Sequence, residues 1–175
     1  MMRALQIAAL ILFILAFAPP AVADVTESDL IVAARALAFT EKPPKGELRV
    51  GVVYAANSPQ SVKQADDLQK MMGAGLRVGG MTLKPVPVKL EDAASADVGM
   101  FFLTEGTGAD GAKMAAATRA KRVPCITVDI AQVQAGACVM GVRSVPKVEI
   151  LVNRAAAADS GIVFASVFRM MITEL

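Results

Sequence analysis

The residues best placed to do chemistry in this 175-residue sequence are polar ones that follow apolar runs. The clearest group is the segment 104–111 (TEGTGADG), which follows VGMFFL and precedes a predicted helix. Three glycines in this position are typical of an anion cradle made from backbone N–H groups. However, Glu105 and Asp110 place negative charge where an anion would sit, and the segment matches neither a Rossmann fingerprint nor a P-loop. We expect either a solvated loop or a site, around Glu105 and Thr107, for an amine, a hydroxyl-rich solute or a basic protein surface.

Three further candidate binding residues also follow predicted strands. Asn57 and Ser58 come after LRVGVVY, and Asp129 comes after VPCITV. Open α/β sheets bind ligands at the edge formed by the carboxyl ends of their strands. The simpler interpretation is local: Asn57 forms a turn, and Ser58 and Asp129 each cap a helix. Only a structure in which these loops face one pocket would favour binding over local roles.

The sequence offers few groups for catalysis or metal binding. It contains no histidine, and its two cysteines are too few for a thiolate zinc site. Ser58 and Ser166 are both explained as helix caps, so a nucleophile with a partnered base is not indicated. Asp97 and Asp110 could in principle form a catalytic carboxylate pair, but helix capping and loop solvation explain them more simply. We therefore predict a protein that is not an enzyme and that holds no cofactor and no metal.

The order of apolar patterns predicts an α/β fold. Continuous apolar runs indicate strands buried on both faces of a parallel sheet, and apolar residues at helical spacing indicate helices between them. Two prolines in LKPVPVKL place that strand at a sheet edge. Strands are expected at 48–54, 83–90, 98–103, 123–128, 137–142 and 148–152, with helices at 28–38, 59–72, 112–122, 129–134 and 154–160 and a last helical turn from 166. The prediction is a single-domain open sandwich with a mainly parallel sheet flanked by helices.

The C-terminal segment carries a further apolar pattern. Val163, Phe164, Val167, Phe168, Met171 and Ile172 would share one helical face. We expect this face to pack on the core, and the alternative is a groove that binds a partner.

Residues 1–23 have the features of a cleaved secretory signal. Arg3 precedes an apolar run that is too short to span a bilayer, and Pro19-Pro20 and the small residues Ala21-Val22-Ala23 follow it. The rival interpretation is an uncleaved anchor. Cleavage would leave a mature domain of residues 24–175 in the periplasm. Without Arg3, 17 basic residues face 16 acidic ones, so we expect no nucleic-acid partner.

Export also bears on Cys125 and Cys138. In an oxidising compartment these two cysteines are expected to pair, and neighbouring predicted strands make the bond feasible. The alternative is two buried free thiols.

The chain resembles the YfiR/HmsC-like periplasmic proteins. The resemblance rests on Phe39 before Pro43, on Thr127-Val128-Asp129, and on Val148-Glu149-Ile150 followed by the segment 153–157 (NRAAA) with Gly161. It implies a periplasmic regulator that binds the exported part of a membrane-bound signalling protein such as a diguanylate cyclase, and so restrains biofilm formation. The chain lacks the tryptophan common before the early proline. It also has cysteines for one disulfide where well-known members have two.

The chain is also similar to one lobe of an ABC-type substrate-binding protein. The residues that carry this similarity are Val50 to Tyr54, Asn57 to Pro59, Val123-Pro124 and Gly136-Ala137. Such receptors hold a solute between two lobes, and one lobe of this length cannot close a cleft alone. A lone lobe therefore favours a protein-binding regulator or a dimer over a carrier of a small-molecule solute, unless a second copy of the chain supplies the other wall.

Overall fold

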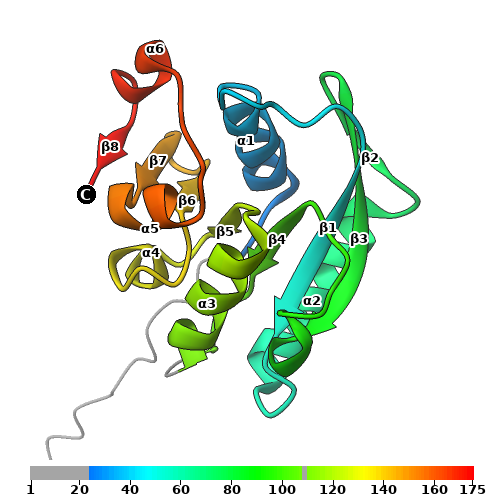
Figure 1. Cartoon of the computed structure of the whole chain (residues 1–175). Helices are drawn as coiled ribbons and strands as arrows, with labels where there is room; N and C mark the ends of the chain where they lie inside the picture. Colours follow the sequence, from blue (N-terminus) through cyan, green and yellow to red (C-terminus); the bar gives the residue numbers. More distant parts are fainter. Residues whose placement is uncertain (1–23, 108–109) are drawn as a thin grey trace, which may run out of the picture.

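The computed structural model describes residues 24–107 and 110–175, and the predicted signal sequence lies outside them. One sheet of eight strands runs through the molecule in the order β2-β3-β1-β4-β5-β6-β7-β8 (Figure 1). The strands are β1 (Gly46–Tyr54), β2 (Leu76–Val78), β3 (Met81–Lys89), β4 (Met100–Leu103), β5 (Cys125–Thr127), β6 (Met140–Arg143), β7 (Glu149–Val152) and β8 (Thr173–Glu174). Only the β2–β3 and β6–β7 pairs are antiparallel. The predicted α/β architecture with a mainly parallel sheet is therefore confirmed.

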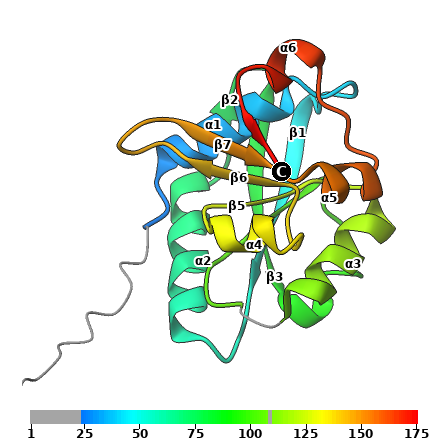
Figure 2. The same ribbon diagram turned by 90° about the vertical axis from the view of Figure 1, so that its left-hand side faces the viewer.

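Helices cover both faces of the sheet. They are α1 (Glu27–Leu37), α2 (Pro59–Met72), α3 (Gly111–Lys121), α4 (Ile130–Gln134), α5 (Arg154–Asp159) and α6 (Ser166–Arg169), with a 3-10 turn at Leu90–Asp92. Figure 2 shows α2 and α3 on opposite sides of the central strands. None of the helices in this part of the chain has the length and apolar character that a membrane crossing needs.

The central strands are buried on both faces, which explains their continuous apolar sequence. Successive side chains of a strand point to opposite faces. In β4, Phe102 packs with α1 and α2 in one core cluster, whereas Phe101 and Leu103 pack with Met114 of α3 in the other. Because neither face can hold polar groups, apolar residues fill every position of β4.

Two local predictions about the first half of the chain were inaccurate. α1 begins at Glu27, one residue before the predicted start at 28: Thr26 caps it, and Asp29 completes a capping box from inside the helix. β3 is not the outermost strand, because the three-residue β2 pairs with its residues Met81–Leu83. The two prolines of β3 lie beyond that pairing, where no donor is needed on the outer side, so the argument from proline holds for that part of β3.

The C-terminal segment differs more from the prediction. Phe164 and Phe168 are buried, but Val163, Val167 and Met171 are each about half exposed or more, at 49%, 54% and 64%. α6 has only four residues, so it cannot present a continuous stripe to the core. β8, which was not predicted, follows α6 and pairs with β7 at the end of the sheet.

Candidate functional site

The candidate site lies at the carboxyl ends of β1, β4 and β5. Thr104 follows β4 directly and ties it to β1 and α2. Its backbone N–H and its hydroxyl both donate to the Val53 carbonyl oxygen, at 3.0 and 2.9 Å. The same hydroxyl lies 2.6 Å from the Ser61 hydroxyl of α2. All three residues are buried, so these bonds fix where the loop after β4 begins.

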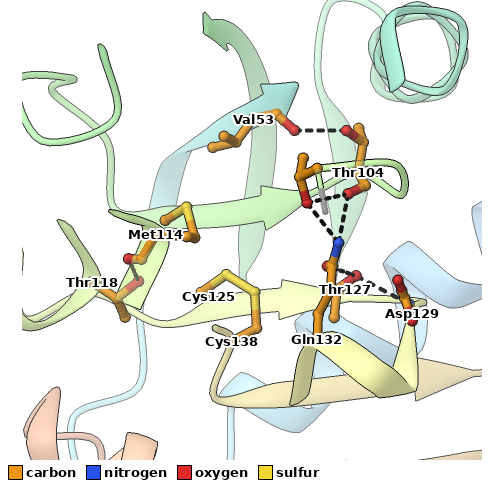
Figure 3. Close-up of a disulfide and its surroundings, with 10 residues drawn as sticks. Val53, Thr104, Met114, Thr118, Cys125, Thr127, Asp129, Gln132 and Cys138 are labelled. Atoms are coloured by element: carbon orange, nitrogen blue, oxygen red, sulfur yellow. Dashed lines mark hydrogen bonds between the residues drawn. A yellow bond between two sulfur atoms is a disulfide. The ribbon is translucent and has the colours of Figure 1, made fainter. Parts of the chain in front are cut away.

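Gln132 of α4 holds the next part of that loop. Its amide nitrogen donates to the Thr104 carbonyl oxygen at 3.1 Å and to the Thr107 hydroxyl at 2.7 Å. Its amide oxygen accepts the Thr127 hydroxyl at 2.9 Å (Figure 3). Gln132, Thr107 and Thr127 are each at least nine-tenths buried. No buried polar atom of the described side chains lacks a partner, and the network fixes the loop residues 104–107.

Glu105 lies at the centre of the candidate site. Its backbone N–H donates to the Gln64 side-chain oxygen at 2.7 Å, and its carboxylate accepts the Gln60 amide at 3.2 Å. Only 9% of Glu105 is exposed. Burial, and next the nearby charge of Asp129, raise the pKa of the Glu105 carboxyl above its usual value. No described Lys or Arg forms an ion pair with it.

Asp129 lies close to Glu105 and has a structural duty of its own. It caps α4, because its carboxylate accepts the Ala131 N–H at 3.0 Å, and its own N–H donates to the Thr127 hydroxyl at 3.1 Å. The predicted capping role is therefore correct. One carboxylate oxygen has no such bond to a described residue, so Asp129 can also face a ligand.

Ser58 joins this group, whereas Asn57 does not. Ser58 caps α2 through its hydroxyl, at 3.3 Å from the Ser61 nitrogen, as predicted. Gly106 packs against it with a positive φ of 73°, and a Cβ at Gly106 would lie 2.7 Å from the Ser58 oxygen. Asn57 is exposed and lines a separate hollow with Asp110 and Lys113. The structure thus brings Ser58, Glu105, Thr107 and Asp129 together and leaves Asn57 apart.

The three glutamines of the site were not predicted from the sequence. Gln60, Gln64 and Gln132 lie on helices, where polar residues usually face solvent. A signal was present for Gln64, which shares the core-facing spacing of Ala65 and Leu68 on α2. A polar residue inside an apolar helical stripe indicates a buried partner.

The remaining chemical candidates lie elsewhere. Asp97 pairs with Arg49 and Asp110 pairs with Lys113, so the two carboxylates take part in separate ion pairs and form no catalytic pair. Within the described ranges no three His, Cys, Asp or Glu side chains are grouped as a metal site would require.

Cys125 and Cys138 form a disulfide bond, with Cα atoms 4.7 Å apart (Figure 3). The bond was predicted, but its setting was partly wrong. Cys125 begins β5, whereas Cys138 precedes β6 by two residues, and the two strands run parallel. Cys125 lies two residues before Thr127 of the candidate site, and both cysteines are fully buried in the second core cluster.

Comparison with known proteins shows the fold alone. No family model matches the chain, and no curated protein matches it. Two solved structures are similar in fold, at 14% and 11% sequence identity and TM-scores of 0.55 and 0.53. They are a conserved domain protein from Vibrio cholerae and an ABC domain in complex with L-Trp from Streptococcus pneumonia. The alignments cover 85% and 81% of this chain but only 59% and 58% of those chains. The fold is thus that of a part of such proteins, and the YfiR/HmsC-like family is not shown.

Proposed function

We propose that this chain is an exported, non-enzymatic binding domain that holds a small solute carrying a cationic amine. The observation that carries the proposal is the buried Glu105 carboxylate beside Asp129, at the edge where open α/β sheets bind ligands. An ammonium group placed between the two carboxylates would relieve their repulsion and donate hydrogen bonds to both. The ABC domain in complex with L-Trp supports a solute of this kind, because L-Trp carries an ammonium group.

Burial of Glu105 favours an amine over a hydrated metal ion. One oxygen of the carboxylate accepts a hydrogen bond from Gln60, and the surrounding threonines and glutamines are hydrogen-bonded to each other. Few ligands for a metal therefore remain, whereas one ammonium needs only two or three acceptors. The network supplies rigidity and Glu105 and Asp129 supply recognition.

A single sheet edge makes one wall of a binding site. Because the chain covers only about three-fifths of the similar structures, the proposed second wall is another copy of the chain. Ligand binding should then favour the dimer, which sedimentation velocity with and without ligand would detect.

A thermal-shift screen tests the proposal. Primary amines, amino acids and their N-acetylated analogues are screened against residues 24–175, because acetylation removes the charge and leaves the rest of the solute unchanged. A ligand at 100 times its dissociation constant should add about 2.7 kcal/mol to the free energy of unfolding. Stabilisation by amines but not by their acetylated analogues is expected, and flat melting curves throughout would contradict solute binding.

A protein-binding regulator, as the YfiR-like resemblance implies, is the second candidate. The observation that favours it is an apolar patch on the C-terminal segment, formed by Val163, Val167, Met170 and Met171, which are 49–80% exposed. This patch would sequester the periplasmic part of a membrane signalling protein such as a diguanylate cyclase. Co-purification from membranes separates the candidates. An inner-membrane protein with an exported sensor domain would support the regulator, and transporter permease subunits would support the solute-binding domain.

A further inference from the structure

A second cavity lies away from the candidate site, between α3, α4 and α5. It is a pit of about 180 Å³, and its floor is Cys138 and Val139. In Figure 3, Thr118 of the pit lies on one side of the disulfide, and Thr127 and Asp129 of the candidate site lie on the other. The two places are therefore separate, and a ligand in one does not touch the other.

The walls of the pit combine methyl groups with buried hydroxyls. Ala115 and Ala156 contribute methyl groups from α3 and α5. Thr118 is 2% exposed and donates to the Met114 carbonyl oxygen at 2.8 Å, which leaves its lone pairs free to accept. Ser160 is also 2% exposed, and it lines the pit. A hydroxyl in this position can donate to, and accept from, a polar group that enters the pit.

The mouth of the pit carries a matched donor and acceptor. Arg119 of α3 and Asp159 of α5 form an ion pair at 3.3 Å, and each side chain is 54% exposed. Their charges cancel, so the pit selects neither a cation nor an anion. A guanidinium beside a carboxylate offers one donor and one acceptor a few ångströms apart, which suits two adjacent hydroxyl groups of a solute.

The size of the pit limits its occupant. Pockets for drug-sized ligands start at roughly 300 Å³, and this pit is smaller. We propose that the pit binds a small, neutral, hydroxyl-rich solute, with Arg119 and Asp159 on adjacent hydroxyls and Ser160 on an inner one. This site differs in place and in ligand chemistry from the amine site, and neither proposal depends on the other.

Heteronuclear NMR with glycerol, myo-inositol and D-glucose as probes tests the pit. At least one probe should cause saturable amide shifts at residues 115–119, 135–139 and 153–160 in the millimolar range. Ala115→Met fills the pit and should abolish these shifts, whereas Ala116→Met, the neighbouring exposed position on the same helix, should keep them. Ser160→Ala should weaken binding about fivefold, the typical loss of one hydrogen bond.

Three outcomes would overturn the proposal. They are no saturable shift at the pit with any of the three probes, shifts confined to residues around Glu105, or shifts that Ala115→Met leaves intact. If Ala115→Met does not fold, Ser160→Ala is compared with the unmodified chain. Equal affinity of the two proteins for the probe would show that the Ser160 hydroxyl does not bind the solute, and would overturn the proposal.

Discussion

The carboxyl edge of the sheet and the C-terminal segment differ in the side chains that form them: a buried hydrogen-bonded network at the first, and partly exposed apolar residues at the second. At the carboxyl edge, Gln132 bonds three threonine groups and is itself 9% exposed, so polar side chains are fixed in a buried network. In the C-terminal segment, Phe168 stacks on Phe39 and Phe164 at centroid distances of 5.0 and 5.3 Å. Its neighbours Val167 and Met170 remain exposed.

This difference separates directional from non-directional recognition. Hydrogen bonds fix the position of a group to within fractions of an ångström, and one lost partner leaves a buried polar atom unsatisfied. An exposed apolar surface has no such geometry and tolerates exchange of one side chain for another. The carboxyl edge should therefore respond strongly to single substitutions and select a small ligand, whereas the C-terminal segment should respond weakly.

Gln132→Ala should have the largest effect. It removes the partners of Thr104, Thr107 and Thr127 inside the protein, and the free energy of unfolding should fall by roughly 3–4 kcal/mol. Urea denaturation measures this loss. Gln134→Ala, at an exposed position of the same helix, is the matched control and should change stability by less than about 0.5 kcal/mol. Equal effects at the two positions would remove the distinction between the network and an ordinary surface.

Breaking the disulfide should come next. The bond between Cys125 and Cys138 closes a loop of about 15 residues, which should contribute about 3 kcal/mol by restricting the unfolded chain. The expected result is a lower urea midpoint after reduction, with NMR signals of Phe39 and Phe168 little changed below the transition. Thiol counting on the denatured, unreduced exported protein gives the control. Two free thiols there would show that the bond does not form.

Gly106→Ala tests how closely the loop is packed. Its positive φ costs a non-glycine residue about 1–2 kcal/mol, and the new methyl group would press on Ser58. We expect a loss of roughly 2 kcal/mol and a weaker response to amines. Gly80→Ala, where a Cβ meets nothing within 4 Å, is the control. A neutral result at Gly106 would mean that the loop can move away from α2.

Met170→Ser should have the smallest effect on stability. Met170 is 80% exposed, so unfolding should change by less than about 0.5 kcal/mol. The same substitution should reduce co-purification of a membrane partner if the C-terminal patch binds one. Phe168→Ser is the contrast, because Phe168 is buried between two rings and its loss should unfold the segment. A large loss of stability from Met170→Ser would show that the patch is covered in the folded protein.

The central architecture could be predicted from the sequence because apolar runs mark its buried strands and cap residues mark the starts of its helices. Ser58 with Pro59 marks the start of α2, and the run at 100–103 can only be a strand buried on both faces. The two shortest strands, β2 and β8, were missed. Segments of two or three residues show no period, and tertiary pairing alone decides their conformation.

The candidate site was predicted only in part. Glu105, Thr107 and Asp129 were found because they follow strands, and the parallel order of β4 and β5 then brings them to one edge. Asn57 follows β1 in the same way but faces a different hollow. The buried glutamines were missed because Gln64 bonds Glu105, 41 residues away, and Gln132 bonds Thr107, 25 residues away. A local sequence pattern does not show contacts between residues so far apart.

The most direct test of the account is a calorimetric titration of the unmodified chain and Glu105→Gln with the amine found in the thermal screen. Burial and the charge of Asp129 raise the Glu105 pKa, so ionisation of Glu105 lowers stability as pH rises through that pKa. Above that pKa, Glu105→Gln should therefore be at least as stable as the unmodified chain, yet lose amine binding. In the unmodified chain, affinity should increase as pH rises through the same range. Unchanged binding by Glu105→Gln would contradict the assignment of Glu105 as the residue that recognises the solute.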